Sequence, residues 1–140
     1  MNVPLPLKRA VFQRAGGRCE YCALSQTGQE ARFHVDHIRP LADGGATRLE
    51  NLALACVSCS LRKGARRTAL DPLTRKRVPL FHPRTQTWSD HFQWKGCRLV
   101  GISATGRATV DMLKINRLLA QAIRGEESLR GRHPPPGWNQ

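Results

Sequence analysis

Aromatic side chains are scarce in this chain: Phe, Trp and Tyr make up 6% of its 140 residues. A chain with so few large rings builds only a modest apolar core, and small cores usually need a staple such as a metal or a disulfide. No apolar run reaches the length of a membrane span, and residues 1–17 contain no continuous hydrophobic signal region. We therefore expect a cytoplasmic protein with no membrane partner, in a compartment that keeps thiols reduced.

Acidic residues are also few, with 10 Asp and Glu against 23 Lys and Arg, and the formal net charge is +13. A cationic excess of this size attracts polyanions through counterion release, largely without regard to base sequence. Nucleic acid is therefore the expected partner. Composition alone leaves a ribosome-associated protein, or a merely soluble basic protein, as the alternative.

No internal repeat is visible, and the chain is expected to have three parts. These are a core over residues 1–70, a C-terminal extension packed on the core over residues 71–125, and a flexible tail over residues 126–140. Apolar spacing predicts helices over 6–15, 57–63 and 107–124, the last stopped by Gly125. Short apolar runs predict strands over 32–38 and 51–55, and a hairpin formed by 91–94 and 97–102.

Four of the five cysteines form two Cys-x-x-Cys pairs, Cys19 with Cys22 and Cys56 with Cys59. Two residues between cysteines let both thiolates face one tetrahedral ion, and two such pairs complete a closed four-sulfur zinc site. A closed site has no open position for substrate, so this zinc would be structural. Two disulfides or a redox pair are the alternatives. Cys97 has no partner and is expected to be a buried free thiol.

The segment between the cysteine pairs carries further motifs. They are His34-Val35-Asp36-His37-Ile38-Arg39-Pro40-Leu41, then Gly44-Gly45, Glu50-Asn51-Leu52 and the run ACVSCSLRKG. In this order, and enclosed by both cysteine pairs, they closely resemble the HNH endonuclease family from about Arg14 to Gly64. The resemblance implies an α+β fold with a small ββα-metal core. The zinc site staples this core, and a β-hairpin plus helix extension follows it.

The resemblance also implies catalytic roles. Asp36 would hold a catalytic Mg²⁺ or Mn²⁺ against the scissile phosphate, His37 would be the general base, and Asn51 would fix the loop that carries the histidine. Phosphodiester hydrolysis needs an activated water and charge stabilisation on the phosphate, which these roles would supply. Neighbours on a regular strand point to opposite faces, so Asp36 and His37 can serve one phosphate only if the chain bends there. In the alternative, the pair merely ends a strand in a zinc-stapled binding module.

The chain departs from the family pattern at the final metal position, usually His or Asn, where it has Ser60. A serine hydroxyl is a weaker and shorter ligand. The cation would then be held by Asp36, water and substrate, or another residue would step in, with His34, His82 and His91 as candidates. By strand alternation His34 shares a face with Asp36, and a packing role is its alternative.

Basic residues follow the last cysteine, and we expect them to line a track for the phosphate backbone. They are Arg62, Lys63, Arg66, Arg67, Arg75, Lys76 and Arg77. A solvated basic linker is the alternative. The predicted function is a metal-dependent endonuclease that hydrolyses phosphodiester bonds of DNA, above all double-stranded DNA. The second hypothesis is a zinc-stabilised nucleic-acid-binding module with a decayed cleavage centre.

Overall fold

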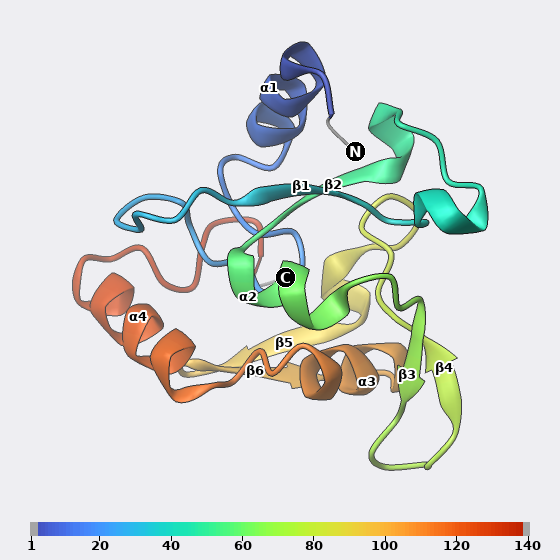
Figure 1. The fold of residues 1–140 in the computed structure, drawn as a ribbon. Coiled ribbons are helices and arrows are strands. Elements are labelled where there is room, and N and C mark those ends of the chain that lie inside the picture. Colours follow the sequence, from blue (N-terminus) through green and yellow to red (C-terminus); the bar gives the residue numbers. More distant parts are fainter. Residues whose placement is uncertain (1–2, 139–140) are drawn as a thin grey trace. The chain divides into compact units, whose positions relative to one another are not determined.

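The computed structural model describes residues 3–138, and the chain divides into two compact units. The first unit contains Met1–Arg67 and His82–Arg84, and the second contains Thr68–Phe81 and Thr85–Gln140. Short helices alternate with two-stranded antiparallel sheets, which confirms the predicted α+β class (Figure 1). Within residues 3–138 no helix combines the length and the apolar character that crossing a membrane requires.

The first unit is built around one hairpin. Helix α1 (Leu5–Arg14) precedes strands β1 (His34–His37) and β2 (Leu52–Ala55), and helix α2 (Val57–Lys63) follows them. Strand β1 pairs antiparallel with β2, with His34 opposite Ala55 and His37 opposite Leu52. Every residue of β2, whose sequence is Leu-Ala-Leu-Ala, is buried, whereas β1 is exposed or half-buried throughout. The polar strand is therefore the accessible one.

Polar side chains tie this hairpin to the segments around it. The Arg14 guanidinium donates to the carbonyl oxygens of Leu49 at 2.9 Å and Leu52 at 2.7 Å. The buried carboxylate of Glu20 accepts the Leu54 amide at 2.8 Å and forms an ion pair with Arg84. Arg84 lies far along the chain yet belongs to the first unit. It also donates to the Leu52 carbonyl at 3.4 Å.

The second unit contains two hairpins and two helices. Strands β3 (Thr68–Leu70) and β4 (Arg77–Pro79) form one hairpin, and β5 (Phe92–Lys95) and β6 (Arg98–Gly101) form the other. The β5–β6 hairpin was predicted, and it turns at Gly96, whose φ is +62°. Strands β3 and β4 were not predicted because each has only three residues and lies in a basic, proline-containing stretch.

The long helix predicted over residues 107–124 is wrong in one respect, because the chain breaks it in two. Helix α3 (Ala104–Met112) ends before Lys114, whose φ is +49°, and α4 (Leu118–Leu129) starts a new direction. The Asn116 side chain lies in the break, where it accepts the Leu99 amide at 2.7 Å and donates to the Leu99 carbonyl at 2.8 Å. Gly125 does not stop α4. A tertiary contact to β6 thus outweighs helix propensity here.

The segment expected to form a flexible tail, residues 126–140, begins inside a helix and makes two aromatic contacts. Residues 126–129 belong to α4. His133 packs edge-on against Trp94 with ring centroids 4.7 Å apart, and Trp138 packs edge-on against Trp88 at 5.2 Å. The last two residues, 139 and 140, lie outside the described part of the chain.

Candidate functional site

The four paired cysteines lie together in the first unit, as their spacing predicted. Their sulfur atoms all lie within 4.8 Å of one another, and all four residues are buried. Cys22 Sγ is 3.7 Å from Cys56 Sγ, close to the separation of about 3.8 Å that tetrahedral Zn–S bonds of about 2.3 Å impose. The donor set therefore fits structural zinc. Cys97 lies in the second unit and is partly exposed rather than buried.

Each cysteine pair forms a knuckle that directs backbone amides at sulfur. The Cys22 amide donates to Cys19 Sγ at 3.5 Å, and the Cys59 amide donates to Cys56 Sγ at 3.4 Å, which also caps the start of α2. Hydrogen bonds with the other three cysteines hold the pKa of Cys56 well below its ordinary value, and the bond with Cys19 has the largest effect. Burial raises the pKa of Cys19. Four buried sulfur atoms gathered this closely fit the ligand set of one tetrahedral cation.

The residues of β1 are placed by the loop that follows them. The backbone bends at Ile38 and Arg39, directly after His37 and before Pro40. The bend therefore follows the Asp36–His37 pair, and both residues still pair with β2. His37 is half-buried, and its Nε2 atom lies 2.9 Å from the Thr47 hydroxyl oxygen. Thr47 was not singled out from the sequence, because no local pattern brings it back to His37.

Asn51 holds this loop closed. Its side-chain oxygen accepts the Arg39 amide at 2.8 Å, and its nitrogen donates to the carbonyl oxygens of Arg39 at 3.1 Å and Ala46 at 2.8 Å. Gly45 is required in this arrangement, because a Cβ atom there would lie 1.8 Å from the Arg39 carbonyl oxygen. The contacts of Asn51 match the loop-fixing role that the resemblance implied.

Ser60 and His34, the two residues of uncertain role, contact each other. Ser60 lies on α2 directly after Cys59, and its Oγ atom is 2.7 Å from His34 Nδ1. His34 is exposed at the start of β1. The Ser60 hydroxyl is therefore within hydrogen-bond distance of the His34 imidazole.

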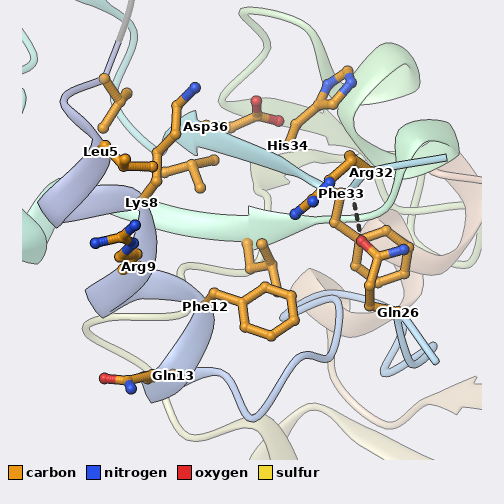
Figure 2. Close-up of a pocket in the computed structure, with 13 residues that line it drawn as sticks. Leu5, Lys8, Arg9, Phe12, Gln13, Gln26, Arg32, Phe33, His34 and Asp36 are labelled. Carbon is orange, nitrogen blue, oxygen red and sulfur yellow. Dashed lines mark hydrogen bonds between the residues drawn. The ribbon is translucent and has the colours of Figure 1, made fainter.

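A groove lies between α1 and β1 and is lined by residues of both. Figure 2 shows Asp36 and His34 extending from β1 and Lys8, Arg9 and Phe12 coming from α1. Arg32 lines the groove as well, and it and both α1 cations are exposed. The groove has a volume of about 1030 Å³. This volume is at the upper end of the range of roughly 300–1,000 Å³ that is usual for small-molecule pockets. The cations of this groove were not recognised as binding residues from the sequence.

The basic residues predicted to contact phosphate do not all reach the surface. Lys63 is buried, and its Nζ atom donates to the Ile38 carbonyl oxygen at 3.3 Å. Burial lowers the pKa of Lys63. The lysine supports the loop after β1 and, being buried, does not belong to the predicted phosphate-contacting surface. The other members of the track are exposed. Those in the first unit are Arg62, Arg66 and Arg67, and those in the second are Arg75, Lys76 and Arg77.

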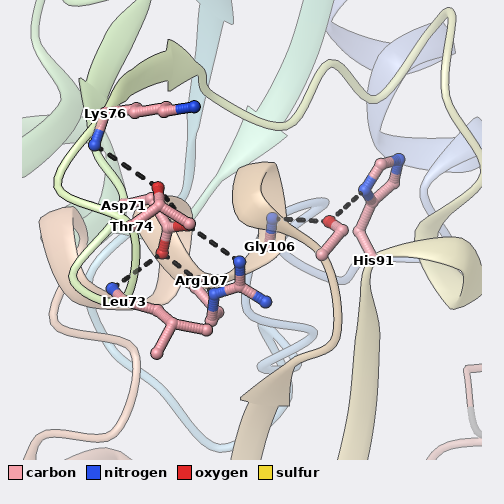
Figure 3. Close-up of polar contacts among 8 residues, drawn as sticks. Asp71, Leu73, Thr74, Lys76, His91, Gly106 and Arg107 are labelled. Carbon is pink, nitrogen blue, oxygen red and sulfur yellow. Dashed lines mark hydrogen bonds and ion pairs between the residues drawn. The ribbon is translucent and has the colours of Figure 1, made fainter.

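The two remaining histidine candidates have other contacts. His82 is half-buried in the first unit, does not line the groove, and accepts the Arg84 amide on Nδ1 at 3.2 Å. Burial lowers its pKa. His91 belongs to the second unit, where its Nδ1 atom lies 2.6 Å from the hydroxyl of Ser103 (Figure 3). That serine also caps α3 by accepting the Gly106 amide.

Figure 3 also shows what organises the β3–β4 turn of the second unit. The buried Asp71 carboxylate accepts two hydrogen bonds from Arg107, at 2.9 and 2.8 Å, and one from the Thr74 hydroxyl at 2.9 Å. The Arg107 guanidinium holds the pKa of Asp71 well below its usual range. The single acidic residue of the basic segment is therefore structural.

Comparison with known proteins agrees with this geometry. Residues 19–66 match the model of the HNH endonuclease family. The chain is similar to the Septu protein PtuB of Bacillus thuringiensis, with 25% identity over 114 residues. That match covers 80% of this chain and 42% of the relative, so the chain spans less than half of the relative's length. No solved structure matches the chain significantly. The match to the family model spans both cysteine pairs, the β1–β2 hairpin and α2, and the chain therefore carries an HNH endonuclease domain over residues 19–66.

Proposed function

We propose that the protein is a metal-dependent endonuclease that hydrolyses phosphodiester bonds of double-stranded DNA. The observation that carries the proposal is the loop after β1, which fixes the ring of His37, the residue that follows Asp36 in the chain. The Asn51 side chain makes three hydrogen bonds across this loop, and Thr47 contacts the His37 ring. A zinc-stapled binding module has no use for an imidazole held in this way next to a carboxylate.

In this proposal His37 is the general base. When its Nε2–H donates to Thr47 Oγ1, Nδ1 carries the lone pair that takes a proton from the attacking water. Asp36, the adjacent carboxylate on β1, holds Mg²⁺ or Mn²⁺ at the scissile phosphate. A divalent cation bound there neutralises charge on the phosphate and on the leaving oxygen. Asn51 acts through the loop and is a positioning residue.

The test of this proposal is plasmid cleavage by the zinc-loaded protein, compared with an Asp36→Asn variant. The wild type should nick or linearise supercoiled DNA when Mg²⁺ or Mn²⁺ is added, and it should be inactive in a chelator too weak to remove the structural zinc. Asp36→Asn keeps the shape of the side chain but removes its charge, so we expect a loss of roughly 10²-fold or more in rate. DNA binding without cleavage in any metal would instead identify a binding module with a decayed centre, the reading that Ser60 favours.

We also propose that the groove between α1 and β1 receives the sugar–phosphate backbone of the cleaved strand. The groove carries three exposed cations, Lys8, Arg9 and Arg32, and Asp36 and His34 line it as well. Phosphate contacts position a duplex without reading its sequence, and these cations share the groove with the proposed metal ligand Asp36. The net charge of +13 supports the same polyanionic partner.

Replacing these three groove cations by glutamine is expected to weaken DNA binding by roughly tenfold or more at physiological salt. Because each lost phosphate contact removes nearly one released counterion, the slope of log affinity against log salt should fall in magnitude by about 3. Fluorescence anisotropy with a labelled duplex at several salt concentrations measures both quantities.

The matched control removes the same charge from exposed positions of the second unit, Lys95, Arg98 and Lys114. It should leave the salt slope within about one unit of the wild type. Equal losses in both triple variants would mean that general charge, and not the groove, holds the DNA.

A further inference from the structure

The contact between His34 and Ser60 determines which atom of the imidazole is available. Nδ1 is 2.7 Å from Ser60 Oγ, and Nε2 has no hydrogen-bond partner among residues 3–138. The side chain is exposed, so Nε2 can be reached from the groove that His34 helps to line. A neutral imidazole carries one proton and one lone pair. When Ser60 Oγ accepts the Nδ1 proton, the lone pair is on Nε2.

Among the acidic residues, Asp36 is the nearest to His34 along the chain, and both lie on β1. His34 and Asp36 are two residues apart on β1, and side chains at that spacing project from the same face of a strand. Both line the groove, and Figure 2 shows both extending from β1 on the same side. The imidazole and the carboxylate thus line one groove, His34 exposed and Asp36 half-buried.

We propose that His34 binds the divalent cation through Nε2 together with the Asp36 carboxylate, and that Ser60 orients His34 without touching the metal. This inference rests on the proposed function for the catalytic use of the cation, but metal binding itself can be measured without cleavage. Ligating histidines almost always place their second ring nitrogen against a hydrogen-bond partner, which fixes the tautomer and the ring orientation. Ser60 occupies that partner's position, held on α2 directly after Cys59.

The ligand set predicts the metal preference. Magnesium prefers oxygen ligands, whereas an imidazole nitrogen favours transition metals such as Mn²⁺ over Mg²⁺. We therefore expect the wild type to bind Mn²⁺ more tightly than Mg²⁺. A His34→Asp variant supplies oxygen in place of nitrogen and should shift the preference toward Mg²⁺.

The experiment is Mn²⁺ titration of the zinc-loaded full chain without DNA, read by electron paramagnetic resonance. Pulsed spectra detect nitrogen coordinated to Mn²⁺ directly. The wild type should show this nitrogen signal, and His34→Ala and His34→Asp should lose it. Ser60→Ala should keep the signal but bind Mn²⁺ about 10–100-fold more weakly, which is the usual cost of removing a partner of a ligating histidine. His82→Gln is the matched control, since His82 does not line the groove, and should match the wild type.

The outcomes separate this inference from the nuclease proposal. A nitrogen signal that persists in His34→Ala, or a wild type without one, overturns the assignment of His34. A Ser60→Ala variant that binds as tightly as the wild type overturns the orienting role of Ser60. A His34-dependent nitrogen signal in a protein that cleaves no DNA leaves the metal site standing and overturns the nuclease. Zinc content and thermal unfolding of each variant confirm that it is folded.

Discussion

Replacing Cys56 by serine is expected to unfold the first unit rather than to weaken it slightly. Cys56 Sγ lies 3.7 Å from Cys22 Sγ and accepts the Cys59 amide at the start of α2. Binding of a structural zinc ion contributes about 10–16 kcal/mol of apparent free energy at neutral pH. A whole domain is stable by only about 5–15 kcal/mol, so loss of the metal removes most or all of this margin.

Thermal unfolding followed by circular dichroism, together with zinc content by mass spectrometry, measures this effect. Cys56→Ser should lose its zinc and its cooperative transition, and a strong chelator should do the same to the wild type. Cys97→Ser is the control, because Cys97 is a partly exposed free thiol in the second unit. It should keep one zinc per chain and an unchanged transition. If Cys56→Ser melts within a few degrees of the wild type, the four-sulfur cluster is not the staple of this unit.

Exchanging His37 for alanine is expected to lower the cleavage rate about 10²- to 10⁴-fold while DNA affinity stays the same. This is the usual contribution of a positioned general base. His37 is half-buried and its Nε2 atom contacts Thr47, so it contributes little to the surface that meets DNA. Single-turnover cleavage of plasmid at saturating protein, with binding measured separately in a chelator too weak to remove the structural zinc, distinguishes the two effects.

His82→Ala is the matched control for this experiment. It removes a half-buried imidazole from the same unit, away from the groove, and should change the cleavage rate by less than about threefold. A His37→Ala variant that retains a rate within a factor of ten of the wild type would remove His37 from the role of base. The search for the base would then move to His34, which is exposed on the same strand.

The parts of this molecule that depend on short-range signals were predictable from the sequence. The cysteine spacing predicted the four-sulfur cluster, and the residues of α2 were predicted with their observed bounds. Gly44 and Gly45 marked the turn, and Asn51 was assigned to the loop that it does hold. In each case the chemistry of a few neighbouring residues decides the local structure, so no knowledge of distant contacts was needed.

Two of the predictions that failed depend on contacts between distant segments. Lys63 looked like one more surface cation, but folding brings it to the carbonyl oxygen of Ile38, where it is buried. The helix over 107–124 breaks because Asn116 pairs with the backbone of Leu99. Thr47 and the cations of the groove were not predicted for the same reason. The sequence around a residue in a loop or on a helix face does not indicate which distant residue it will contact.

Arg84 has a consequence for where the HNH domain can be cut from the chain. The segment matched by the family model stops at residue 66, but Arg84 returns to the first unit and neutralises Glu20, whose side chain is only 9% exposed. A fragment that ends at the family boundary would leave that carboxylate buried beside the backbone of Leu54 without its cation. Breaking a buried ion pair in this way costs about 3–5 kcal/mol. The shortest fragment that keeps this ion pair therefore extends beyond the residues matched by the family model, and transferring residues 19–66 alone to another protein would leave Glu20 without Arg84.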